Sequence, residues 1–219
     1  QRQKMLDGQW ADDGCQYCQR IEQAGGASDR TMAIRDQNPF LISPELDSSI
    51  TAVEVTPTIV EVYFKNTCNM KCVYCGPQHS SLWAEENNKF QSDFNNTTNS
   101  PYTILVSYQN TDYQKMVDSF WEYLETDNRF STLKRYHILG GEPFLLTELD
   151  DSINFWDAHR NPDLTFSIIT NLNVPHKIFK KYIDRFETLI KDNKIWKLQL
   201  TASIDAWGEQ QQYTRFGLD

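Results

Sequence analysis

The chain has 219 residues, with 21 Lys and Arg against 30 Asp and Glu, which gives a formal net charge of −9. This length predicts one domain, or one domain with a small addition. Hydrophobic residues form 39% and aromatic residues 13% of the chain, which argues against a disordered protein. The negative balance does not suit a broad nucleic-acid surface, and no apolar run approaches the length of a membrane span. We therefore expect neither a nucleic-acid partner nor a membrane.

Five cysteines fall into two groups. Cys15 and Cys18 form a Cys-x2-Cys pair, whereas Cys68, Cys72 and Cys75 lie close together further along the chain. Their number and uneven spacing do not suit a disulfide framework. Thiolates grouped in this way bind a soft metal or an iron–sulfur cluster, and such reduced sites belong in a reducing compartment. The cysteines therefore predict a metal centre in a cytoplasmic protein.

In chain order, residues 1–48 form a predicted N-terminal extension, which is polar, carries the first cysteine pair and ends in a proline-containing linker. A short strand is predicted at 50–55. Side-chain patterns then predict four strands, at 59–64, 136–139, 164–170 and 196–204. Helices are predicted at 80–90, 113–124, 147–158 and 175–191. Residues 91–110 are predicted as an inserted loop with a short strand at 102–107. Thr147 and Asp150 are expected to form a capping box, and Pro175 to occupy the first turn of its helix.

Strands that alternate with helices predict an α/β fold with a parallel sheet, in which functional groups gather at the C-terminal ends of the strands. Those ends carry, in order, the loop of Cys68, Cys72 and Cys75, then Gly140-Gly141-Glu142, then Thr170-Asn171, then Ser203 and Asp205. Three thiolates can hold three irons of a [4Fe–4S] cube and leave the fourth iron open. Tyr74 can pack beside a cofactor, the glycines allow close approach, and Glu142 can accept from an ammonium group.

These residues carry a family resemblance. Cys68-x3-Cys72-x2-Cys75 with Tyr74, followed one βα unit later by Gly140-Gly141-Glu142-Pro143, resembles the radical S-adenosylmethionine superfamily from about Thr56 onward. The resemblance implies a partial TIM-like (βα)6 barrel at 49–219, with about four βα units, truncated after the fourth strand. It also implies an enzyme that cleaves S-adenosylmethionine reductively at a [4Fe–4S] cluster and uses the 5′-deoxyadenosyl radical for hydrogen abstraction.

The resemblance assigns a role to each candidate residue. Cys68, Cys72 and Cys75 would be the cluster ligands, and Gly140, Gly141 and Glu142 would hold the methionyl amino group. Asn171, Ser203 and Asp205 would contact the ribose or carboxylate of the cofactor, and Tyr74 would pack beside its base. Leu172 departs from the pattern, because relatives often have Gly after Thr-Asn.

A narrower resemblance is to the twitch radical proteins, which are related to the SPASM peptide-modifying enzymes. It rests on Asn69-Met70-Lys71, Cys75-Gly76-Pro77, Ser80-Ser81-Leu82-Trp83 and Ser203-x-Asp205-Ala206-Trp207-Gly208-Glu209. The stretch around Cys15 and Cys18 is similar to the second half of a cysteine motif that precedes the radical domain, which implies an auxiliary iron–sulfur cluster. The first half would lie upstream of Gln1, so we expect an interior piece of a longer protein. Such relatives suggest a peptide or small-protein substrate and an external electron donor.

Several alternatives stay open. The cysteine loop together with His79 supplies a Cys3His set, so a non-catalytic zinc-binding interaction module is the competing function. Cys15 and Cys18 can also form a zinc knuckle or a redox dithiol. Radical chemistry on RNA is disfavoured by the charge, and the cations Lys177, Lys180, Lys181 and Arg185 are interpreted as a solvated helix face. Asp205 can instead be a helix cap, and Asn171 an ordinary turn residue.

Overall fold

The structure is a computed structural model and describes residues 4, 9–10, 15–28, 31–32, 56–90 and 111–217. The chain divides into two compact units, residues 1–59 and 60–219, and each is described by itself. The predicted strand at 50–55 and the predicted insertion at 91–110, with its strand at 102–107, lie outside the described residues. The same holds for most of the linker between residues 31 and 46.

The described part of the first unit centres on one helix, α2 (Gln16–Gln23), which begins directly after Cys15. Cys18 therefore lies in the first turn of this helix, and both thiols are free and partly buried. The helix ends in a turn in which buried Ser28 donates a hydrogen bond to Glu22 over 2.5 Å. This contact folds the chain after α2 back onto the helix.

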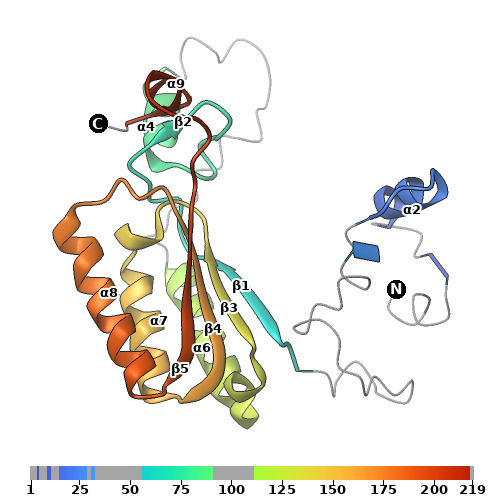
Figure 1. Ribbon diagram of the computed structural model, residues 1–219, viewed down its shortest axis with the longest axis vertical. Coiled ribbons are helices and arrows are strands. Elements are labelled where there is room, and N and C mark those ends of the chain that lie inside the picture. The colour runs from blue at the N-terminus through green and yellow to red at the C-terminus, as the bar shows by residue number, and fades with distance from the viewer. Residues whose placement is uncertain are drawn as a thin grey trace. The chain divides into compact units, whose positions relative to one another are not determined.

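The second unit is built on a four-stranded sheet (Figure 1). Its strands are β1 (Ile59–Tyr63), β3 (Arg135–Leu139), β4 (Asn161–Thr170) and β5 (Ile195–Ala202), and their spatial order is β1-β3-β4-β5. β4 pairs in parallel with β3 on one side and with β5 on the other. The predicted α/β fold with a parallel sheet is confirmed. The partial TIM-like barrel stays a prediction, because the four strands of this sheet among the described residues fit an open sheet as well as part of a barrel.

Four helices between these strands confirm the side-chain patterns: α4 (Ser81–Lys89), α6 (Thr111–Glu125), α7 (Thr147–Ala158) and α8 (His176–Lys191). Helix α9 (Glu209–Thr214), which follows β5, and the 3-10 turns η2 (Thr126–Thr132) and η3 (Pro143–Leu145) were not predicted. A second, small sheet was not predicted. In it, β2 (Lys71–Cys72), inside the cysteine loop, pairs antiparallel with β6 (Arg215–Phe216), near the end of the chain. The small sheet therefore joins the first and last described segments of this unit.

The core forms where alternate residues of β3 and β4 meet the helices. The ring of Tyr136 packs edge-on against Trp156 of α7, and its hydroxyl lies 3.0 Å from that of Ser152. Phe166 packs in the same way against Phe186 of α8. All four aromatic side chains are buried, and each contributes about 1.5–3 kcal/mol by leaving water. These contacts hold the sheet and thereby place the ends of its strands.

The opposite face of β3 and β4 is polar, which is unusual because parallel strands commonly read as continuous apolar runs. Arg135 pairs in register with Thr165, and His137 with Ser167. The Arg135 guanidinium donates to the Ser167 hydroxyl over 3.3 Å, and His137 Nδ1 lies 3.2 Å from a Glu61 carboxylate oxygen. The alternation of polar and apolar residues therefore distinguishes the helix-covered face from the other face.

Two predictions about helix starts are wrong. Helix α7 begins at Thr147 after Leu146, and no side chain caps its first turn, so Thr147 and Asp150 form no capping box. The Asp150 carboxylate points to α8 and binds there. Pro175 precedes α8 as its capping residue, so His176 is the first helical residue. In both cases the helix is confirmed, while its first turn differs from the prediction.

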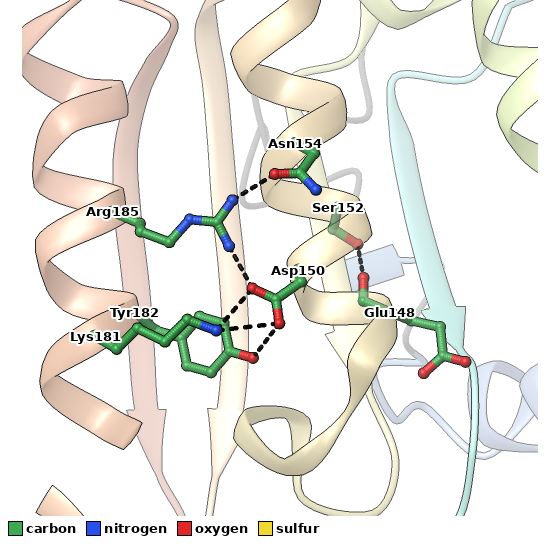
Figure 2. Close-up of polar contacts among 7 residues, drawn as sticks. All are labelled: Glu148, Asp150, Ser152, Asn154, Lys181, Tyr182 and Arg185. Carbon is green, nitrogen blue, oxygen red and sulfur yellow. Dashed lines mark hydrogen bonds and ion pairs between the residues drawn. The ribbon is translucent and has the colours of Figure 1, made fainter. Parts of the chain in front are cut away.

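Asp150 joins α7 to α8 through three side chains of α8 (Figure 2). Lys181 Nζ lies 3.1 Å from Asp150 Oδ1, the Tyr182 hydroxyl donates to Oδ2 over 2.9 Å, and Arg185 pairs with Oδ1. The other Arg185 nitrogen donates to the Asn154 amide oxygen over 2.6 Å. Partial burial raises the pKa of Asp150, but the hydrogen bonds from Lys181 and Tyr182 outweigh it, so the pKa is lowered. Two of the cations expected on a solvated face thus connect helices.

We predict that Asp150→Asn lowers the free energy of unfolding near neutral pH by about 1 kcal/mol, a value that allows for solvent screening of a partly exposed group. The pKa of Asp150 is lowered in the folded state. Asp150 therefore stabilises the folded state fully above the unfolded-state pKa of about 3.9. This stabilisation is lost as the pH falls through the folded-state pKa. Urea unfolding of both proteins near neutral pH and at about pH 3 measures the difference.

Asp184→Asn is the matched control, because Asp184 pairs with Lys180 on the exposed surface of α8. Such pairs contribute about 0.3–0.5 kcal/mol. Equal losses in the two variants, or a loss for Asp150→Asn that persists at acid pH, would contradict the role given to Asp150.

Candidate functional site

The three clustered cysteines line one cavity of about 370 Å³ at the C-terminal ends of the sheet strands. Five further residues expected at a cofactor site line it with them, namely Tyr74, Gly140, Gly141, Asn171 and Ser203. The remaining lining residues are Tyr63, Met70, His79, Leu139, Ile169, Thr170 and Arg215. The structure therefore brings together residues that the sequence separates by up to 152 positions, from Tyr63 to Arg215. Glu142 and Asp205 are not among the lining residues.

The start of α4 holds the cysteine loop in shape. The Ser81 hydroxyl donates to the carbonyl of Cys68 and accepts from its amide, each over 3.1 Å. The hydroxyl of Ser80, the N-cap of α4, donates to the carbonyl of Met70 over 2.6 Å. The Trp83 indole donates to the carbonyl of Cys72 over 3.0 Å. The side chains of Ser80, Ser81 and Trp83 thus form hydrogen bonds with backbone groups of the loop. The Ser-Ser-x-Trp motif therefore stabilises the shape of the cysteine loop.

The Gly-Gly turn after β3 packs against the same loop. Gly140 and Gly141 both have positive φ, +83° and +51°. A Cβ atom on Gly140 would collide with the Tyr63 ring, and one on Gly141 would collide with the carbonyl of Thr67. The Glu142 amide donates to that same carbonyl over 2.7 Å. Glycine is therefore required here for close approach to the cysteine loop, in addition to any approach to a ligand.

Glu142 does not point its carboxylate at the cavity but holds the end of β4. One carboxylate oxygen accepts from the Thr170 hydroxyl over 2.8 Å and from the Phe144 amide over 3.2 Å. The other oxygen accepts from the Asn171 amide over 2.8 Å. Burial raises the pKa of Glu142, although these three hydrogen bonds act in the opposite direction. Glu142 therefore positions the site, and its acceptor capacity is used within the protein.

The polar residue after β4 reaches the cysteine loop directly. The Asn171 amide group donates to the side chain of Asn69 over 3.0 Å and lies 3.9 Å from the sulfur of Cys68. The next residue, Leu172, has a positive φ of +60°, and its amide donates to the Thr170 hydroxyl over 3.0 Å. Leu172, which stands where the resembled pattern often has Gly, thus has a left-handed backbone. Glycine adopts this conformation without strain.

Arg215 is a cavity residue that the sequence analysis missed. In the small sheet it is the direct register partner of Cys72, and its guanidinium donates to the Cys72 sulfur over 3.8 Å. Arg215 also donates to Asp205 over 2.6 Å, and the Tyr74 hydroxyl donates to the same carboxylate over 2.6 Å. These two bonds lower the pKa of Asp205. Only the pairing of β6 with β2 places Arg215 at the cavity. A two-residue strand is too short to show a periodic side-chain pattern, so this pairing could not be predicted from the sequence.

The electrostatics of the cavity favour the protonated thiols of Cys68 and Cys75 while no cation is bound. Burial raises the pKa of Cys68, and the nearby Glu142, Cys72 and Cys75 charges raise it further. Burial likewise raises the pKa of Cys75. Arg215 is the only Lys or Arg among the residues that line this cavity. A metal centre bound here would displace the thiol protons and supply the positive charge that the cavity otherwise has only at Arg215.

The described residues contain no group of three His, Cys, Asp or Glu side chains that converge closely enough for a single metal ion. The three cysteines line a common space of about 370 Å³. Cys15 and Cys18 belong to the other unit, so their position relative to this cavity is not described. A second cavity, of about 540 Å³, adjoins the first and shares Asn171 and Ser203 with it.

A scan against models of protein families finds no match to this chain, and searches of curated proteins and of solved structures find no relative. In the part of the chain that the structure describes, no helix combines the length and apolar character of a membrane span. Any function therefore has to be argued from the site itself.

We predict that Thr170→Val lowers the free energy of unfolding by about 1–3 kcal/mol, because it leaves the Leu172 amide without its acceptor and removes one of the two hydrogen bonds to a Glu142 oxygen. Thr165→Val is the matched control on the same strand. Thr165 is equally buried, but its hydroxyl has no hydrogen-bond partner among the described residues, so the isosteric change is expected to be neutral or stabilising. Chemical denaturation measures both; equal losses would contradict the role of Thr170 at the end of β4.

We predict that Leu172→Gly raises the free energy of unfolding by about 1 kcal/mol, because a left-handed backbone costs a residue with a side chain about 1–2 kcal/mol. Leu172→Ala is the control, since it removes the same partly exposed side chain but keeps the Cβ atom. Thermal unfolding of the three proteins measures the effect. A stabilisation by alanine as large as that by glycine would show that the backbone is not the cause.

Proposed function

We propose that this protein is a radical S-adenosylmethionine enzyme. One observation carries the proposal: Cys68, Cys72 and Cys75 line a single cavity together with the Gly-Gly turn and the polar ends of β4 and β5. The cavity lies at the C-terminal ends of parallel strands, where α/β folds place their ligands. A TIM-like barrel and a twitch/SPASM-like relationship belong to the same proposal.

The residues fit a [4Fe–4S] cluster better than a single ion. Three free thiols face a common space, which matches a cube with one thiolate on each of three irons. In this proposal Cys68, Cys72 and Cys75 hold the cluster and leave one iron open.

The other lining residues would hold S-adenosylmethionine. Backbone groups of Gly140 and Gly141 would bind its amino group. Arg215 would supply a positive charge to its carboxylate, and Ser203 would supply a hydroxyl group. Tyr74 is largely exposed and would pack beside the cofactor. When bound, cluster and cofactor supply a one-electron cleavage that gives methionine and a 5′-deoxyadenosyl radical, which abstracts hydrogen from substrate.

The protein's own side chains set the conditions for that chemistry. Arg215 is buried beside Cys72, where its charge offsets the negative charge of thiolates. Asp205 fixes Arg215, so in this proposal it acts as a positioning residue. Met70, Leu139 and Ile169 give the cavity apolar walls, which limit the access of water to a radical. Glu142 keeps the ends of β3 and β4 together behind this wall.

The second cavity supports a peptide or small-protein substrate. Its apolar residues Leu172, Ile204 and Trp207 are exposed, with 91% of Trp207 accessible. Exposed Gln212 adds an amide group that suits a polypeptide backbone, whereas buried Gln211 accepts from the amides of Asp205 and Ala206. An external electron donor, a reducing cytoplasmic compartment and an auxiliary cluster on Cys15 and Cys18 complete the proposal.

A zinc-binding interaction module is the second candidate function. The observation that favours it is His79, which lines the cavity with the three cysteines and whose ring Nδ1 lies 3.2 Å from the Tyr63 hydroxyl. Zinc-binding histidines usually have such a partner on the second ring nitrogen. This module would be colourless and would not bind S-adenosylmethionine.

Anaerobic reconstitution with iron and sulfide tests the proposal. We expect about four irons per chain at the three-cysteine loop and 5′-deoxyadenosine that forms only with dithionite. Cys72→Ala is expected to lose the cluster and the cleavage, because it removes one of three ligands. Cys18→Ala is the matched control: it removes a ligand of the proposed auxiliary cluster only, so it is expected to lose that iron and to keep the cluster at the three-cysteine loop. Unchanged iron content and cleavage in Cys72→Ala, or zinc in place of iron in the wild type, would refute the assignment.

A further inference from the structure

The hydrogen bonds of His79 fix which nitrogen of its ring is free. The Tyr63 hydroxyl donates to the carbonyl of Gln78 over 2.7 Å, and the same hydroxyl oxygen lies 3.2 Å from His79 Nδ1. The hydroxyl has one proton and gives it to a carbonyl that can only accept. His79 Nδ1 must therefore be the donor in the second contact. In the neutral imidazole, Nε2 then carries no proton and keeps a free electron pair.

This arrangement is the one that metal-binding histidines typically have, with one ring nitrogen donating to an oxygen and the other available to a metal. Of the residues that line the cavity, His79 is the only histidine. Its ring is exposed and touches Tyr63 edge-on, with 5.5 Å between the ring centroids, so core packing does not account for it. The donor set of the cavity is thus three thiols and one oriented imidazole.

Tyr63 also places His79 on the side of the Gly-Gly turn. The Tyr63 ring lies directly against Gly140, so closely that a Cβ atom there would collide with it. In the proposed function the turn of Gly140 and Gly141 binds the amino group of S-adenosylmethionine, so the open iron faces this turn. The hydrogen-bonded pair of Tyr63 and His79 therefore stands beside the position of that iron.

On the basis of the proposed function, we propose that His79 Nε2 binds the open iron while S-adenosylmethionine is absent and that the cofactor displaces it. The exchange breaks one iron–nitrogen bond and forms the bonds to the cofactor, without a change of oxidation state. His79 would protect the fourth iron from loss in the resting protein. It would also compete with the cofactor, so that only the fraction of molecules with His79 released can bind.

The first test is pulsed electron paramagnetic resonance of the reconstituted, dithionite-reduced protein that contains 15N-labelled histidine. We expect a strong hyperfine coupling from a histidine nitrogen that disappears when S-adenosylmethionine is added. This measurement uses the wild-type protein, so it does not depend on the folding of any variant. A reduced cluster without histidine coupling would overturn the inference.

The second test is the affinity for S-adenosylmethionine, measured anaerobically by equilibrium dialysis. If His79 holds the iron in about nine-tenths of molecules, His79→Ala tightens the apparent Kd about tenfold. Tyr63→Phe, which keeps the ring against Gly140 but removes the oxygen that orients His79, is expected to tighten it less. His176→Asn is the control, because His176 is exposed at the start of α8 and does not line the cavity.

The outcomes separate this inference from the proposed function. An unchanged Kd in His79→Ala, with cluster and cofactor binding intact, overturns the role of His79 and leaves the proposed function standing. Stoichiometric zinc in the wild type that is lost in His79→Ala overturns both and supports the zinc module. A wild-type protein that assembles no cluster and binds no cofactor also overturns both.

Discussion

The geometry of the cavity depends on one buried carboxylate, that of Glu142. Its two oxygens accept three hydrogen bonds, two of them from Thr170 and Asn171 at the end of β4. Its amide donates to Thr67 in the loop that follows β1. One residue thus connects the ends of three neighbouring strands, β1, β3 and β4. Burial of a carboxylate is costly unless its lone pairs are satisfied, so these connections are also what makes the buried Glu142 tolerable.

A second constraint acts on the cysteine loop from the other end of the chain. β6 pairs with β2 so that Arg215 stands opposite Cys72, and the carbonyl of Gly217 accepts from the Asn173 side chain over 2.6 Å. The loop is therefore enclosed by the turn after β3, by the residues after β4 and by the segment after β5. A cavity enclosed by so many short contacts holds its lining residues in place, which a metal centre or a cofactor requires.

The sequence predicts the parallel sheet and the gathering of strand ends because both follow from short-range patterns. Side-chain alternation locates β3 and β4, and the C-terminal ends of parallel strands must meet at one edge. The roles of Glu142 and Arg215 could not be predicted, because they depend on pairing between residues 28 and 143 positions apart. The capping box at Thr147 failed for the same reason: the partners of Asp150 lie on α8, more than thirty positions away.

The charges around the cavity explain why a cationic centre suits it. Cys68 feels the charges of Glu142, Cys72 and Cys75, all of which disfavour its thiolate, and burial adds to this effect. Burial likewise favours the protonated thiol of Cys75, and among the described lining residues Arg215 carries the only guanidinium. A centre with several positive charges would act on all three sulfurs at once, whereas Arg215 donates to Cys72 and lowers the pKa of Cys75 only enough to offset part of the effect of burial. In the proposed function a cluster with one thiolate on each of three irons would meet this requirement at all three cysteines.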